Sequence, residues 1–101
     1  MEQEYIKSIL ITGAASGIGA ATVKKIAKKN VSLTLTTKSN SEALEEIVDD
    51  ARQKGSFVNY ICGDLSDKKF IKKLVALGKV KTGVIDQFVA NAGYAEKKTI
   101  W

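Results

Sequence analysis

The sequence has 101 residues, 45% of them hydrophobic, which suffices for one domain with a core, and no apolar run approaches the roughly 20 residues of a membrane helix. It contains no histidine and one cysteine, Cys62, so an internal disulfide is excluded and a metal site is disfavoured. The net charge of +5 comes from lysine doublets without interleaved aromatic rings, so we interpret them as solvated helix faces and expect no nucleic-acid or membrane partner.

Strand and helix patterns alternate from the start of the chain. Residues 8–12, SILIT, form a continuous apolar run that predicts a strand buried on both faces of a parallel sheet. Residues 18–29 place apolar side chains on one helical face and lysines on the other. Residues 31–37, VSLTLTT, alternate apolar and hydroxyl side chains and are rich in β-branched residues, which predicts a second strand.

The second predicted helix has the clearest periodicity in the sequence. Its apolar residues recur at i, i+3, i+4 and i+7 and are Leu44, Ile47, Val48 and Ala51. Ser39 and Glu42 are spaced as a capping box at its start, and Gly55 is a C-terminal stop. Residues 57–62, FVNYIC, predict the third strand.

The last predicted elements are a third helix and a fourth strand. The helix begins at Asp64 or Ser66 and ends at Gly78, and the strand lies in residues 84–93, VIDQFVANAG. The order β-α-β-α-β-α-β requires parallel strands with helical crossovers. We therefore expect an α/β fold, a Rossmann-like open parallel sheet with helices on both faces, in one domain formed by residues 1–101.

A glycine-rich loop joins the first strand to the first helix. Gly13 allows a tight turn, Gly17 lets the backbone approach a ligand, and Gly19 allows close packing of helix and sheet. The amide hydrogens at the start of a helix favour an anion such as a pyrophosphate. The loop therefore predicts a nucleotide site.

Three motifs in this order resemble those of the short-chain dehydrogenase/reductase family. Residues 12–19, TGAASGIG, are similar to its T-G-x-x-x-G-x-G signature, residues 63–65, GDL, to its aspartate motif, and residues 89–93, VANAG, to its N-N-A-G motif. Ala90 departs from the first asparagine of the last motif, whereas Asn91 is kept. Together the motifs span nearly the whole chain.

The resemblance implies a nicotinamide dinucleotide site built from these motifs and the end of the second strand. The loop would hold the pyrophosphate, Asp64 would bind the adenine amino group, Leu65 would border the adenine, and residues 91–93 would line the ribose and nicotinamide side. Alternatively, Asp64 only caps a helix and Asn91 only braces the sheet. The predicted cofactor residues are Gly13, Ala15, Ser16, Gly17, Ile18, Gly19, Thr37, Lys38, Ser39, Asp64, Leu65, Asn91, Ala92 and Gly93.

The end of the second strand favours NADP(H) over NAD(H). No carboxylate stands there to bind a ribose 2′-hydroxyl, whereas Lys38 offers a cation and Thr37 and Ser39 offer hydroxyl groups to a 2′-phosphate. Alternatively, Lys38 is a solvated loop lysine. Ser16 also stands where many NADP-preferring members of the family have a basic residue.

The family reaction is hydride transfer between nicotinamide and a small carbonyl or alcohol, assisted by a serine and a Tyr-x-x-x-Lys pair far beyond the N-A-G motif. Residues 94–98, YAEKK, spell that pair but follow N-A-G immediately, so we assign no catalytic residue to this chain. The resemblance implies the N-terminal, cofactor-binding part of a longer, homo-oligomeric reductase. Among family members it leans toward the ketoacyl carrier-protein reductases.

Two other functions remain open on the sequence alone. One is a non-enzymatic NADP(H)-binding regulatory module, and the other is a basic RNA-associated fold. A gene that continues in frame with a serine and a Tyr-x-x-x-Lys pair would favour the enzyme. The charged segment MEQEYIK lacks the apolar centre of a signal peptide, so we expect a cytoplasmic protein.

Overall fold

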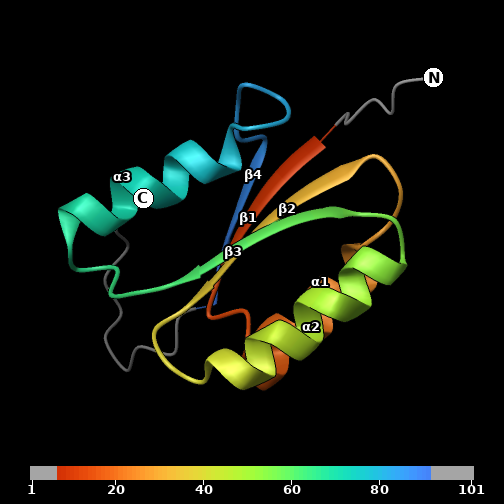
Figure 1. Ribbon diagram of the computed structural model, residues 1–101, viewed down its shortest axis with the longest axis horizontal. Coiled ribbons are helices and arrows are strands. Elements are labelled where there is room, and N and C mark those ends of the chain that lie inside the picture. The colour runs from red at the N-terminus through yellow and green to blue at the C-terminus, as the bar shows by residue number, and fades with distance from the viewer. Residues whose placement is uncertain (1–6, 92–101) are drawn as a thin grey trace.

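The computed structural model describes residues 7–91 and has the predicted order of strands and helices (Figure 1). The described elements are β1 (Lys7–Thr12), α1 (Gly17–Ile26), β2 (Val31–Thr37), α2 (Ser41–Gln53), β3 (Phe57–Cys62), α3 (Lys68–Gly78) and β4 (Gln87–Ala90). Every described strand pair is parallel, in the order β3-β2-β1-β4. Helices α1 and α2 cover one face of the sheet and α3 covers the other, which confirms the predicted Rossmann-like fold.

The core between the sheet and the α1–α2 pair is the larger of two. Ile9 pairs in register with Leu33, and Leu33 pairs with Val58, so one row of apolar side chains crosses three strands. Val23 of α1 and Leu44 of α2 close on this row, and both are fully buried. The helical and strand periods read from the sequence therefore converge on one core.

The apolar core between the sheet and α3 is smaller, and more hydroxyl groups lie around it. Its apolar cluster consists of Leu10, Phe70 and Leu74. Because side chains alternate along a strand, the residues two positions before and after Leu10 in β1 share its face, and so do the alternate residues of β2 that include the partners of Ser8 and Leu10. They are the buried residues Ser8, Thr12, Ser32, Thr34 and Thr36.

Two predicted helix boundaries differ from the structure. Helix α1 ends at Ile26 and not at residue 29, because Ala27 is extended and the Ser56 hydroxyl bonds both the N–H and the carbonyl of Lys28 at 2.9 Å. The predicted capping box of α2 is wrong: Asn40 precedes the helix in the left-handed conformation, φ 66°, with no side-chain cap. The predicted stop is confirmed, since Gly55 has φ 100° just after that helix.

The third helix and fourth strand also begin later than predicted. Asp67 caps α3, accepting a hydrogen bond from the Lys69 N–H at 2.9 Å, so neither Asp64 nor Ser66 begins the helix. Strand β4 covers only Gln87–Ala90. The preceding residues form a turn in which Gly83 has φ 79° and the Thr82 hydroxyl donates to the Val84 carbonyl at 2.6 Å.

Candidate functional site

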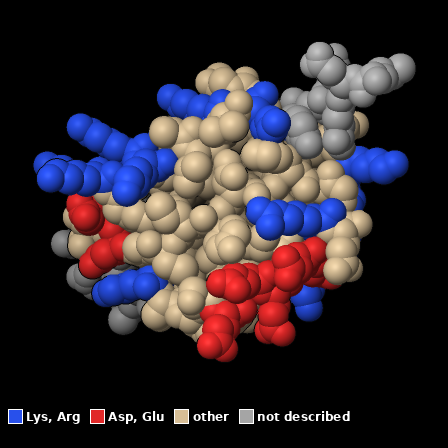
Figure 2. Space-filling model, viewed as in Figure 1, with Lys and Arg blue, Asp and Glu red and all other residues tan. Residues whose placement is uncertain are grey.

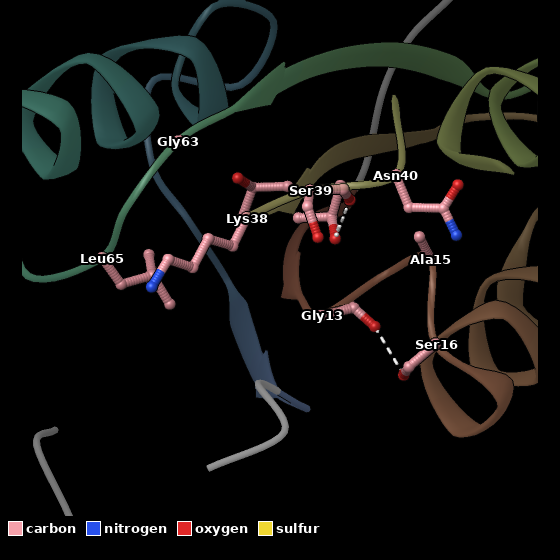
Figure 3. A pocket seen from close by; sticks show the side chains of 10 residues that line it. Gly13, Ala15, Ser16, Lys38, Ser39, Asn40, Gly63 and Leu65 are labelled. Atoms are coloured by element: carbon pink, nitrogen blue, oxygen red, sulfur yellow. Dashed lines mark hydrogen bonds between the residues drawn. The ribbon is translucent and has the colours of Figure 1, made fainter. Parts of the chain in front are cut away.

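The loop after β1 is a compact turn that leads directly into α1. Gly13 has φ 61°, a conformation that glycine adopts without strain. The Ala14 N–H donates to the Thr36 carbonyl at 3.0 Å, which ties the loop to the end of β2. Ser16 caps the helix: its hydroxyl donates to the Gly13 carbonyl at 2.8 Å and accepts from the Gly19 N–H at 3.2 Å (Figure 3).

The glycines at the start of α1 differ in what surrounds them. A Cβ on Gly19 would lie 2.1 Å from the Gly13 carbonyl oxygen, so this position packs directly against the loop backbone. A Cβ on Gly17 would meet no atom within 4 Å. The close packing predicted for Gly19 is therefore present, and open space lies beside Gly17.

The first turn of α1 also has unpaired backbone donors. The Gly19 N–H is taken by Ser16, but within residues 7–91 no hydrogen bond is made to the N–H groups of Gly17 and Ile18. The Ile18 side chain is 73% exposed. Unpaired N–H groups at the positive end of a helix suit an anion.

A cavity of about 450 Å³ adjoins this helix start, at the carboxyl ends of β1, β2 and β3. Its lining residues are Gly13, Ala15, Ser16, Thr36, Thr37, Lys38, Ser39, Asn40, Gly63 and Leu65. Seven of the predicted cofactor residues thus meet around one cavity. Thr36, Asn40 and Gly63 were missed as site residues, although Gly63 belongs to the GDL motif and the other two flank the end of β2.

Lys38 reaches across this cavity toward the loop after β3. Figure 3 shows its side chain extending from the end of β2 toward Leu65. Its Nζ lies 3.9 Å from Oδ2 of Asp64, and the two side chains are 78% and 47% exposed. An exposed pair at this distance is weak, so the Lys38 ammonium group remains free to bind another anion.

Asp64 is held by its own loop. Its Oδ1 accepts hydrogen bonds from the N–H and the hydroxyl of Ser66, each at 2.9 Å. These two bonds, with a smaller contribution from the Lys38 ammonium group, lower the pKa of the Asp64 carboxyl from its usual value of 3.8. Because Asp67 caps α3, Asp64 is not the helix cap, and its Oδ2 faces Lys38.

Asn91 joins the end of β4 to β1. Its N–H donates to the carbonyl and to the hydroxyl oxygen of Thr12, both at 3.2 Å. Its buried Nδ2 has no hydrogen-bond partner among the described residues. The brace is therefore made by the backbone, and the side-chain amide is left for another acceptor. The predicted residues Ala92 and Gly93, and residues 94–98, lie outside the described part of the chain.

Two kinds of feature are absent from residues 7–91. No described helix has the length and apolar character needed to cross a bilayer. The same residues contain no group of three or more histidine, cysteine, aspartate or glutamate side chains placed to hold a metal ion.

The fold is a Rossmann-like α/β domain with a cavity at the carboxyl ends of its strands, and comparison with known proteins gives its family. The family model described as short chain dehydrogenase matches residues 7–100. The chain is 37% identical over 87 residues to an uncharacterised oxidoreductase of Listeria monocytogenes, covering 86% of this chain and 35% of that protein. It is 32% identical over 89 residues to the cis-4-hydroxycyclohexanecarboxylate dehydrogenase of Sinomonas cyclohexanicum, covering 88% and 35%.

Solved structures agree with these relatives. A short-chain dehydrogenase of Oenococcus oeni aligns with a TM-score of 0.76 and 27% identity, over 92% of this chain and 43% of that one. The hydroxysteroid dehydrogenase of Escherichia coli aligns with a TM-score of 0.77 and 26% identity, over 97% and 41%. The chain therefore belongs to the short-chain dehydrogenase/reductase family, as its nucleotide-binding Rossmann part. It spans about a third of the length of the curated relatives that it matches.

Proposed function

We propose that this chain binds NADP(H), in preference to NAD(H), in the cavity at the carboxyl ends of β1, β2 and β3. The observation that carries the proposal is the continuity of two features: the open helix start beside Gly17, and the cavity crossed by Lys38. A dinucleotide needs both, because its pyrophosphate and its adenosine half bind side by side. When bound, the cofactor would supply or accept a hydride.

The pyrophosphate would lie at the start of α1. The N–H groups of Gly17 and Ile18 would donate to its oxygens, and the absence of a side chain on Gly17 would allow the close approach. Ser16 and Gly13 hold the loop in shape through their hydrogen bonds to each other. The loop is therefore organised before any ligand arrives, which lowers the entropic cost of binding.

The 2′-phosphate would be bound by Lys38 and Ser39. The Thr37 hydroxyl donates to the Ser39 carbonyl at 2.9 Å, so Thr37 shapes the loop at the end of β2 rather than serving as a free donor. Residues 36–40, TTKSN, contain no carboxylate. The carboxylate of Asp64 lies 3.9 Å from Lys38 but is supplied by the loop after β3, which bounds the adenine side of the cavity with Leu65.

The longer protein would transfer hydride between nicotinamide and a small carbonyl or alcohol. Several relatives are named as dehydrogenases. Within the class of small carbonyl substrates, we propose a ketoacyl compound. The described tyrosine, Tyr60, lies in β3 outside the cavity, with the Arg52 guanidinium 5.9 Å from its ring centre. Tyr5 and Tyr94 lie outside the described residues, and Tyr94 follows the N-A-G motif immediately. We propose that the catalytic groups belong to the longer protein and not to this chain. We propose a cytoplasmic homo-oligomer as its working form.

A pair of titrations tests the cofactor assignment. Nicotinamide fluorescence is followed as the chain is added to NADPH and, separately, to NADH. A charge-assisted hydrogen bond to the 2′-phosphate should make NADPH bind about tenfold tighter or more. Equal titration curves would contradict the proposed preference for NADPH. If neither cofactor bound, the proposed cofactor site would be wrong.

The catalytic part of the proposal needs a second assay. NADPH absorbance is followed with a panel of ketones, using this chain and the longer protein. The longer protein should oxidise NADPH with at least one ketone or ketoacyl substrate, and this chain alone should not. Turnover by the chain alone, or loss of most activity in the longer Tyr94→Phe variant, would contradict the assignment of catalysis to groups beyond it.

A further inference from the structure

Helices α2 and α3, which cover opposite faces of the sheet, carry opposite charge, whereas α1 on the α2 side also carries Lys24 and Lys25. Residues 68–81, which include α3, contain six lysines and no acidic residue, whereas residues 41–53 of α2 contain five acidic residues and one arginine. Figure 2 shows acidic side chains gathered over α2 and basic ones over α3. Because α2 and α3 cover opposite faces, the α3 side presents a basic surface of its own.

An apolar groove runs beside these lysines, between α3 and the edge strand β3. Its lining residues are Ile61, Lys73, Ala76, Leu77 and Val80, around a volume of about 380 Å³. Val80 is 58% exposed and Ala76 is also exposed, so the groove opens to solvent. Lys69 precedes Lys73 by four residues on α3, which places a second ammonium group on the same helical flank.

We propose that this groove and its lysines form a docking surface for an acidic amphipathic helix of another protein. An apolar side chain of that helix would enter the groove over Leu77 and Val80. Carboxylates one turn away would meet Lys69 and Lys73. An apolar floor with a basic rim is the complement of such a helix, since apolar anchors give affinity and the rim charges give orientation and choice of partner.

Two other occupants fit the same surface less well. A single-stranded nucleic acid would find lysines, but the groove offers four aliphatic side chains and no aromatic ring on which a base could stack. A second copy of this chain could offer the acidic helix α2. The exposed residues of α2 are all polar, however, so that helix brings no apolar side chain to the groove.

The groove is independent of the proposed cofactor cavity. None of its five lining residues lines that cavity. A groove variant should therefore keep its NADPH titration curve, which provides a check that the variant is folded. If NADPH does not bind this chain at all, circular dichroism and the thermal midpoint serve the same purpose, so the two proposals fail separately.

The test uses two fluorescein-labelled synthetic helices of fifteen residues. One carries leucine along one face and glutamate elsewhere, and the other has glutamine in place of every glutamate. Fluorescence anisotropy is followed as the chain is added. The acidic peptide should bind at least about tenfold more tightly than the neutral one, and the double variant Lys69→Glu/Lys73→Glu should lose about tenfold. Val80→Ser should weaken binding several-fold without lowering the thermal midpoint, because Val80 is largely exposed.

The matched control is Lys24→Glu/Lys25→Glu on α1. It makes the same change of net charge on the opposite face and should bind the acidic peptide as the unmodified chain does. Equal losses in the two double variants would show attraction by net charge alone and overturn the proposal. Equal binding of the acidic and neutral peptides, no binding of the acidic peptide, or tighter binding of a single-stranded RNA 15-mer would also overturn it.

Discussion

The two faces of the sheet are built from the same four strands but are covered very differently. On the α1–α2 face, thirteen buried residues form one continuous apolar cluster. On the α3 face, the buried cluster has three residues, and the side chains around it are mainly hydroxyls. Toward β4, Val84 is 54% exposed and Phe88 is 41% exposed.

The difference indicates that the α1–α2 face mainly stabilises the fold, whereas the α3 face leaves surface for contacts with other polypeptide. The α1–α2 face buries the apolar area that stabilises the fold, and it also fixes the glycine loop and the end of β2. The α3 face leaves apolar and basic groups at the surface, where other polypeptide can cover them. Ser8 and Asn59 attach α3 mainly at its C-terminal end, through bonds to the carbonyls of Gly78 and Leu77 at 2.6 and 3.5 Å.

A matched pair of leucine deletions measures this contrast most directly. Leu33 is fully buried on the α1–α2 face, and Leu74 is 2% exposed on the α3 face. Leu33→Ala should lower the free energy of unfolding by about 3–5 kcal/mol and Leu74→Ala by about 2–3 kcal/mol, because fewer neighbours surround the second site. Urea unfolding provides both values. An equal or larger loss at Leu74 would contradict the unequal contribution of the two faces.

The glycine pair at the start of α1 separates folding from binding. In Gly19→Ala the new methyl group would collide with the Gly13 carbonyl, so we expect a loss of about 1–3 kcal/mol in stability and a loss of cofactor binding. Gly17→Ala meets open space and should change stability by less than about 1 kcal/mol. It should still weaken NADPH binding, because the methyl group would occupy the space proposed for the pyrophosphate. Thermal unfolding and NADPH titration of both variants decide the point, and unchanged NADPH affinity in Gly17→Ala would contradict it.

One charge reversal at the cavity and one on α3 test the specificity of the cofactor site. Lys38→Asp should weaken NADPH binding by about 10- to 100-fold and leave NADH binding nearly unchanged, because only NADPH carries the 2′-phosphate. Lys72→Asp makes the same charge change on α3 and should alter neither affinity. Equal effects of the two variants on NADPH would show a general electrostatic attraction instead of a site at Lys38.

The smallest expected effect is the pH dependence associated with Asp64. Its hydrogen bonds from Ser66 lower its pKa in the folded chain below the unfolded value. The stabilisation is then fully present above the unfolded pKa and is lost as the pH falls through the folded pKa. Thermal midpoints of the unmodified chain and Asp64→Asn should therefore converge as the pH is lowered below 3.8. A constant difference across the acid range would contradict the assignment.

Much of this architecture could be predicted from the sequence. Segments with apolar residues at strand spacing alternate with segments at helical spacing, and this alternation predicted the order of strands and helices. Each spacing places the apolar side chains of its segment on one face, which can pack into a common core. The glycine positions also predicted the tight turn at Gly13 and the close packing at Gly19. Family membership followed from three short motifs and their order along the chain.

The boundaries of the elements and the residues that line the cavity were harder to predict from the sequence. In residues 63–68, GDLSDK, three side chains can cap a helix, and the choice of Asp67 depends on tertiary packing. A Cβ on Gly63 would lie 2.3 Å from the Phe70 ring, so that ring packs on the Gly63 backbone and helps to fix where the helix begins. Thr36 and Asn40 line the cavity because of how β2 ends in space, which no local pattern specifies.

Amide hydrogen exchange tests the central claim most directly, because it reports on both faces in one experiment. The claim is that NADPH occupies the carboxyl-end cavity beside α1. The predicted result is slower exchange on adding NADPH at residues 13–19, 37–39 and 63–65, with no change along α3. Slower exchange centred on α3, or none at the glycine loop under saturating NADPH, would contradict the account.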